Sequence, residues 1–244
     1  MSLQTLTYRK ENHVGIIEFV QPETERTEID RLSDEITELC AEIAWDEEAR
    51  VILLTIPREN LFPLDKRAGG FPLAEPVGKL HQPVIAAIEG DAIGQGFELA
   101  LACDIRIATE LSTFRLPQIE RGLIPWGGGT QRLARLVGRG RALEIVLTGE
   151  GVDAQEAYRI GLASRIVPPD QLTKEAMDLA REMAAKSPIA LRFSKEAIHK
   201  GMDLTLQQGL VLEADLYLLI HTTKDRAEGI RAFQEKRKAK FEGR

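Results

Sequence analysis

The chain has 244 residues, of which 43% are hydrophobic and 29% are charged. The composition is typical of a globular protein, and the length allows one domain with an appendage or two modest domains. The net charge of −6 gives no reason to expect binding to nucleic acid or to an anionic membrane surface.

The two cysteines and four histidines do not suggest a disulfide framework or a metal site. Cys40 lies on an apolar helical stripe and Cys103 lies within an apolar run, so both are interpreted as small core residues. The histidines lack metal-ligand spacing. The N-terminal sequence lacks the build of a signal peptide, and no apolar run is long enough to span a membrane. We therefore expect a cytoplasmic protein that holds no metal.

Strands and helices alternate in the first part of the chain. A β-branched run at 14–20 predicts a strand, and Thr27 is expected to begin a helix with an apolar stripe. That stripe consists of Ile29, Leu32, Ile36, Leu39, Cys40 and Ile43. The continuous apolar run 50–56 predicts a strand that is covered on both faces. Residues 57–78 are rich in proline and glycine, which predicts a loop.

The same alternation continues through the middle of the chain. Residues 83–90 predict a second buried strand, 97–102 the beginning of a helix and 103–109 another strand. Strand, helix and strand at this spacing imply right-handed crossovers and a largely parallel sheet.

From Asp170 onward the pattern is helical. Ala176, Leu179, Ala180 and Met183 form one apolar stripe. Further helical patterns follow at 189–200, 204–221 and 225–240. The boundary between the two parts of the chain is expected near 184–190.

Glu98 is the one carboxylate in the mostly apolar stretch AIGQGFELALA, and it follows two glycines that bracket Gln95. Burying a carboxylate costs free energy unless a partner compensates. Gly94 and Gly96 permit unusual backbone dihedral angles and close approach of a ligand. Free amides at the start of a helix favour negative charge.

Two functional interpretations of this stretch compete with a simple structural one. In the structural interpretation the glycines form a tight turn, and Glu98 is an acid favoured by the helix dipole. A dinucleotide-binding fingerprint does not fit, because Leu99 occupies the third glycine position. The other functional interpretation is thioester enolate chemistry, in which an amide stabilises the oxyanion and the carboxylate moves a proton.

Long blocks of the sequence resemble the crotonase, or enoyl-CoA hydratase/isomerase, superfamily. They include VGIIEFVQP, KLHQPVIAAIEGDAIGQGFELALACDIRIAT, FRLPQIERGLIPWGGGTQRLARLVGRGRALEIVLTGEGVDAQEAYRIGLASRIVP and DRAEGIRAFQEKRKAKF. The resemblance implies an α/β fold with a crotonase-like ββα spiral core and an acyl-CoA pocket over 1–186. It also implies a C-terminal helical trimerisation region over 187–244.

The resemblance also implies an activity and an assembly. The expected activity is that of a hydro-lyase on an acyl-CoA thioester, with coenzyme A as part of the substrate and no other cofactor. The expected assembly is a homotrimer or homohexamer. Gln95 matches the residue whose N–H forms part of the oxyanion hole, within a turn that includes Gly94, and Glu98 matches the first of two hydratase glutamates. Most members have glycine at the position of Gln95, and a side chain there disfavours a positive φ.

The match departs from the family at the second hydratase glutamate, where this chain has Gln118. Glutamine can orient water but cannot transfer a proton at neutral pH, and loss of one general acid or base typically costs roughly 10²–10⁴ in rate. Glu120 could replace it if 118–120 is extended, because residues two apart then share a face. If the segment is helical, Glu120 is interpreted as a solvated acid beside Arg121.

A second departure lies in the loop that supplies the other oxyanion donor, because it lacks the family's Gly-x-Asp signature. Aligning Phe62 with the family's aromatic residue puts that donor near Lys66. Lys66 and Arg67 could contact the phosphates of coenzyme A, although such residues are often only solvated.

Three further features are assigned from the same resemblance. The turn in PWGGGTQRL could cradle phosphate on physical grounds, whereas in relatives it borders the acyl pocket. Trp126 takes a position usually held by a small residue, so it either narrows that pocket or packs in the core. Phe233 and Lys236 match positions from which relatives reach a neighbouring subunit's CoA site.

Three functions remain open on the sequence alone. The first is hydration of an enoyl thioester, with Glu98 as acid and base and Gln118 as the residue that positions water. The second is isomerisation, for which one carboxylate can move a proton between C2 and C4. The third is a catalytically weakened family member that binds acyl-CoA or a partner protein.

Overall fold

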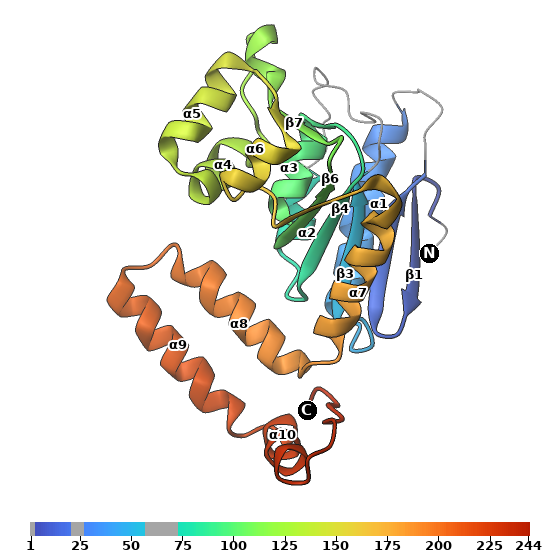
Figure 1. The fold of residues 1–244 in the computed structure, drawn as a ribbon, viewed down its shortest axis with the longest axis vertical. Helices are drawn as coiled ribbons and strands as arrows, with labels where there is room; N and C mark the ends of the chain where they lie inside the picture. Colours follow the sequence, from blue (N-terminus) through green and yellow to red (C-terminus); the bar gives the residue numbers. More distant parts are fainter. Residues whose placement is uncertain (1–2, 21–26, 57–72) are drawn as a thin grey trace.

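A six-stranded sheet forms the centre of the protein in the computed structural model, which describes residues 3–20, 27–56 and 73–244 (Figure 1). The strand order is β1-β2-β3-β4-β6-β9, with β1 antiparallel to β2 and all other neighbours parallel. The strands are β1 (Leu6–Glu11), β2 (Val14–Phe19), β3 (Val51–Ile56), β4 (Val84–Ile88), β6 (Ile105–Thr109) and β9 (Arg165–Val167). The predicted, largely parallel sheet is confirmed.

Both faces of this sheet are covered, as the continuous apolar run at 50–56 predicted. Ile52 and Leu54 of β3 face the larger core cluster. From α1 (Thr27–Ala44) that cluster contains Leu32, Ile36, Leu39, Cys40 and Ile43. Val51 and Leu53 point to the opposite face, where α7 (Leu172–Ala184) packs against the sheet. Alternation along a strand thus divides one apolar run between two cores.

A three-stranded sheet of order β5-β7-β8 lies beside the main sheet and carries the site described below. β5 is parallel to β7, and β7 is antiparallel to β8. The elements of this region are β5 (Ala92–Ile93), α3 (Gln95–Ala102), β7 (Thr113–Arg115), the 3₁₀ helix η1 (Pro117–Arg121), α4 (Gly129–Val137), α5 (Arg139–Thr148), β8 (Val152–Asp153) and α6 (Ala154–Arg159).

The structure corrects the predicted elements in three places. Residues 57–78 were predicted to be a loop, but Ala74–Gly78 forms the short helix α2, which covers α3. Strand β1 was not predicted, because its polar residues become a strand only by pairing with β2. The last predicted helix, 225–240, ends at Gln234 as α10 (Lys224–Gln234).

Buried Arg106 on β6 fixes the far end of α3. Its guanidinium donates to the carbonyl oxygens of Cys103 at 2.6 Å, Ala100 at 3.3 Å and Leu162 at 2.7 Å. The last carbonyls of a helix have no partner within the helix. Arg106 donates to the Ala100 carbonyl of α3 and to the Cys103 carbonyl just after the helix, so a buried charge holds this end of α3.

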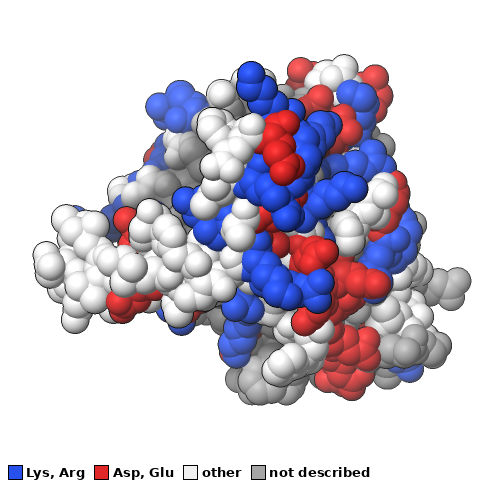
Figure 2. Space-filling view, turned by 90° about the horizontal axis from the view of Figure 1, so that it is seen from below, with Lys and Arg blue, Asp and Glu red and all other residues white. Residues whose placement is uncertain are grey.

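Helices α8 (Pro188–Gly201), α9 (Leu206–Ile220) and α10 project from the body of the protein as an arm (Figure 1). The base of the arm is anchored to the core at Asp104, which pairs with Lys195 at 2.7 Å and with His199 at 2.8 Å. The end of the arm farthest from the body, formed by α8 and α9, carries few charged side chains in the view of Figure 2. Among the described residues, no helix is both long and apolar enough to cross a membrane.

Candidate active site

The strand β5 and its parallel neighbour β7 bring two predicted site segments to one edge of the small sheet. Ile93 at the end of β5 is paired with Arg115 at the end of β7, and the N–H of Gly94 donates to the Arg115 carbonyl at 2.9 Å. The chain leaves β5 toward Gln95 and leaves β7 toward Gln118. Because parallel strands end at the same edge, both glutamines emerge there.

The turn before α3 leaves the Gln95 amide free of a helical partner. The first bond of the helix runs from the Glu98 N–H to the Gly94 carbonyl at 3.0 Å. The amides of residues 95–97 therefore have no acceptor within the helix. Gly94 carries the strained conformation, with φ 57° and ψ −120°, and among the described residues Gln95 is not one of those with positive φ. A side chain at position 95 is thus compatible with the turn.

Glu98 lies on the first turn of α3 and is 1% exposed. Its Oε1 accepts a hydrogen bond from the N–H of Gly129 at 2.9 Å. Its Oε2 is buried and has no hydrogen-bond partner among the described residues. The carboxylate is therefore held on one side and has an unused oxygen on the other, as a group that transfers a proton requires.

The glycine-rich turn at 127–129 fits closely around this carboxylate. A Cβ added to Gly127 would lie 3.1 Å from Glu98 Oε2, and one added to Gly129 would lie 3.0 Å from Oε1 and 2.9 Å from the Pro125 side chain. Larger residues would push the carboxylate away. The Gly129 amide is occupied by Glu98, so this turn does not offer it to a phosphate.

Opposing effects act on the acidity of Glu98. Burial raises the pKa of its carboxyl, whereas the amides of Gly129 and Gly127 and the charge of Arg132 lower it, with a net shift upward. A carboxyl with a raised pKa binds and releases a proton more readily near neutral pH.

Gln118 is 5% exposed, and its side-chain oxygen has no hydrogen-bond partner among the described residues. It lies in the 3₁₀ helix η1, where residues two apart point in different directions. Glu120 accordingly points elsewhere and forms an ion pair with Arg115, with a half-exposed side chain. The segment has the helical form, so Glu120 does not join Gln118.

Comparison with known proteins identifies the family. The family model described as enoyl-CoA hydratase/isomerase matches residues 9–244. The chain belongs to the enoyl-CoA hydratase/isomerase family. It is 38% identical over 245 residues to a mitochondrial enoyl-CoA hydratase of Pongo abelii, a match that covers 95% of this chain and 84% of that protein.

Two further relatives support the assignment. A 2,3-dehydroadipyl-CoA hydratase of Escherichia coli is 46% identical over 164 residues, which is 67% of this chain and just under two thirds, 64%, of the relative. A crystal structure of enoyl-CoA hydratase from Bacillus anthracis superposes with a TM-score of 0.88 at 36% identity, covering 99% of this chain and all of that one. The expected crotonase fold is thereby confirmed.

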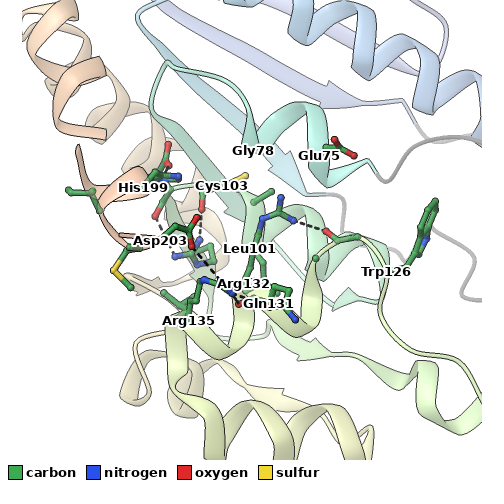
Figure 3. Close-up of a pocket in the computed structure, with 18 residues that line it drawn as sticks. Glu75, Gly78, Leu101, Cys103, Trp126, Gln131, Arg132, Arg135, His199 and Asp203 are labelled. Atoms are coloured by element: carbon green, nitrogen blue, oxygen red, sulfur yellow. Dashed lines mark hydrogen bonds and ion pairs between the residues drawn. The ribbon is translucent and has the colours of Figure 1, made fainter. Parts of the chain in front are cut away.

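In this enoyl-CoA hydratase/isomerase family member, Trp126 is not a core residue. Its side chain is 52% exposed, and it lies at one edge of a cavity of about 680 Å³ between α2, α3, α4 and α8 (Figure 3). His199 and Asp203 lie at the other edge. Glu98 does not line this cavity, because the glycine turn separates the two.

Two further predicted site residues belong to the C-terminal arm rather than to the site around Glu98. Phe233 is 85% exposed on α10, and Lys236 follows that helix, which lies near the start of α8 and not at the tip of the arm (Figure 1). Lys66 and Arg67 lie outside the described residues. Across the part of the chain that the structure describes, no group of three His, Cys, Asp or Glu side chains is arranged to hold a metal ion.

The sequence analysis missed the partners of Glu98, namely Gly127, Gly129 and Arg132. Two signals pointed to them. A carboxylate predicted to be buried requires donors, and three consecutive glycines at the start of the helix α4 can supply amides at close range. Nothing in the sequence joins these two signals across 31 residues.

Proposed function

We propose that the protein is a hydro-lyase that adds water to an enoyl-CoA thioester through an enolate held in an oxyanion hole. The observation that carries the proposal is the buried Glu98 carboxylate, one oxygen of which has no partner among the described residues. It lies on the same helical turn as the Gln95 amide, which has no acceptor within the helix. The family membership supplies the substrate class. Coenzyme A enters as part of the substrate, and no other cofactor takes part.

The mechanism uses three groups of this chain. The Gln95 N–H donates to the thioester oxygen as negative charge develops on it. Gln118 orients the water that attacks C3, and Glu98 accepts a proton from that water and returns one to C2. The product gains one oxygen and two hydrogens. Gly94 and Trp126 are proposed to border the acyl group.

Conversion of an acyl-CoA panel in water enriched in ¹⁸O tests this function. We expect the enoyl-thioester absorbance to fall and the product to carry one labelled oxygen. Unlabelled product with a shifted double bond would instead support isomerisation, which the single carboxylate at this site also allows. Binding of acyl-CoA without turnover of any thioester would contradict both enzymatic proposals.

A change at Gln118 tests its role in orienting water. Gln118→Met keeps the size of the side chain but removes its hydrogen bonds, and we expect hydration to slow about tenfold, since such a bond is worth ~1–1.5 kcal/mol. Gln118→Glu is the matched variant that keeps an acceptor, and its rate should be at least that of the unmodified protein. Equal rates for Gln118→Met and the unmodified protein would remove Gln118 from the mechanism.

The arm at 187–244 is proposed to bind further copies of this chain in a homotrimer or a dimer of trimers. Its support is an exposed apolar surface on α9, defined by Leu206, Leu210, Val211, Tyr217, Leu218 and Leu219. Exposed apolar surfaces of this kind mark protein interfaces. In such an assembly Phe233 and Lys236 would lie near a neighbour's CoA site.

Light scattering during size-exclusion chromatography tests this assembly. We expect a mass of three or six chains, and a smaller species for the double variant Leu210→Asp and Leu218→Asp. An unmodified protein that runs as a single chain at micromolar concentration would exclude the proposed assembly.

The cytoplasm is the proposed compartment, because Cys40 and Cys103 are both free and buried. Unpaired thiols are ordinary in a reducing environment.

A further inference from the structure

Arg132 packs against the glycine turn from the side opposite Glu98. Its Nη1 donates to the Gly127 carbonyl at 2.6 Å, the contact drawn as a dashed line in Figure 3. A Cβ on Gly128 would overlap this nitrogen, and one on Gly78 would lie 3.1 Å from Nη2. The guanidinium thus lies close against backbone that has no side chains, and Arg132 is half-buried on α4.

The turn is therefore enclosed between an anion and a cation. Glu98 contacts Gly127 and Gly129 on one side, while Arg132 contacts Gly127 and Gly128 on the other. A shift of the turn away from Arg132 would move the Gly129 amide that holds the carboxylate. Arg132 therefore influences where the Glu98 carboxylate lies, because both side chains contact the same short turn.

Other charged groups near this pair act more weakly or from further away. Among the described residues, Arg132 is the one ionisable group that lowers the pKa of Glu98, against the dominant effect of burial. Glu75 on α2 and Cys103 after α3 face Arg132 rather than Glu98. Arg135, one turn further along α4, is directed to Gln131 and Asp203.

We propose that Arg132 is a positioning residue, which holds the glycine turn against Glu98 and places its positive charge beside that turn. The inference rests on the proposed function of Glu98 as an acid and base. It assigns a role to a side chain outside the three groups of the proposed mechanism. In the sequence Arg132 is the arginine of GGTQRL, and nothing around it indicates this role.

The pH dependence of kcat/KM distinguishes this role from a merely structural one. Glu98 must be ionised to accept a proton, so its titration forms the acid limb of the profile. In Arg132→Met the lost cation should move that limb upward by about one pH unit, because a nearby opposite charge lowers a carboxyl pKa by at least that much. Arg132→Lys keeps the positive charge, so its acid limb should lie close to that of the unmodified protein.

Two controls make the outcome decisive. Arg135→Met removes a neighbouring arginine that does not contact the turn, and its acid limb should coincide with that of the unmodified protein. The second control needs no turnover: infrared spectroscopy follows ionisation of the Glu98 carboxyl, identified by subtracting the Glu98→Gln spectrum. Its midpoint should shift in Arg132→Met by the same amount.

The outcomes separate this inference from the proposed function. If no enoyl-CoA is converted but the infrared midpoint shifts, the proposed function fails and the control of Glu98 by Arg132 stands. If turnover is seen and Arg132→Met lowers only kcat and thermal stability, with both midpoints unmoved, Arg132 merely supports the fold. An equal shift in Arg135→Met would also overturn the inference.

Discussion

Glu98→Gln is expected to slow the hydration of enoyl-CoA by roughly 10²–10⁴, the usual loss when a general acid or base is removed. Glutamine has the shape of glutamate, and its Oε1 can still accept from the Gly129 N–H, so the turn at 127–129 should stay in place. The loss should appear in kcat with little change in KM, because the change removes proton transfer rather than binding. Loss of enoyl-thioester absorbance measures it.

The same variant should be as stable as the unmodified protein at pH 8, or more stable. Burial raises the folded-state pKa of Glu98 above its value in the unfolded chain. A raised carboxyl pKa means that the folded protein binds more protons between the two pKa values, so stability falls as the pH rises through that window. Glutamine does not ionise, so the Glu98→Gln variant does not lose this stability at high pH.

Thermal unfolding at pH 8 checks this, with Glu144→Gln, a change to an exposed carboxylate on α5, as the matched control. If Glu98→Gln hydrates enoyl-CoA at a rate within threefold of that of the unmodified protein, another group moves the proton. A large drop in its melting temperature would mean that the carboxylate supports the fold instead.

Gln95→Pro is expected to lower kcat by roughly 10²–10³, the effect of removing one oxyanion-hole donor. Gln95 is the first residue of α3, and proline is tolerated at that position because its N–H has no helical acceptor in any case. The substitution therefore removes the proposed donor while the helix keeps its first hydrogen bond, from Glu98 to Gly94.

Gln95→Ala is the matched control, since it shortens the side chain and keeps the N–H. Its kcat should stay within a few-fold of that of the unmodified protein. If Gln95→Pro and Gln95→Ala are equally active, and circular dichroism shows both folded, the oxyanion is stabilised elsewhere. If both are equally impaired, the side chain rather than the amide is the functional group.

Local pattern predicted the main sheet well where each strand has its own apolar signature. The run at 51–56 and the stripe of α1 needed only alternation and helical period to be placed. β1 and α2 were missed for a shared reason: β1 is stabilised by pairing with β2, and α2 by packing on α3. Neither kind of stabilisation leaves a periodic signal in the segment itself.

The site residues, too, could be predicted only where the signal lies in neighbouring residues. The glycines around Gln95, the lone acid at position 98 and the replacement of a carboxylate by Gln118 can all be read along the chain. The choice between an extended and a helical segment at 118–120 could not be made, because both suit its composition. In the structure the segment forms the 3₁₀ helix η1, which directs Glu120 toward Arg115.

By itself the sequence determined that a helix beginning with a free amide carries a carboxylate into an apolar environment, since helix start, glycine turn and burial are properties of neighbouring residues. Only the tertiary structure decided what holds that carboxylate. The Gly129 amide and the Arg132 charge reach it because α4 packs against α3. A hydrogen bond across 31 residues depends on where two helices meet in space, and no local pattern encodes that meeting.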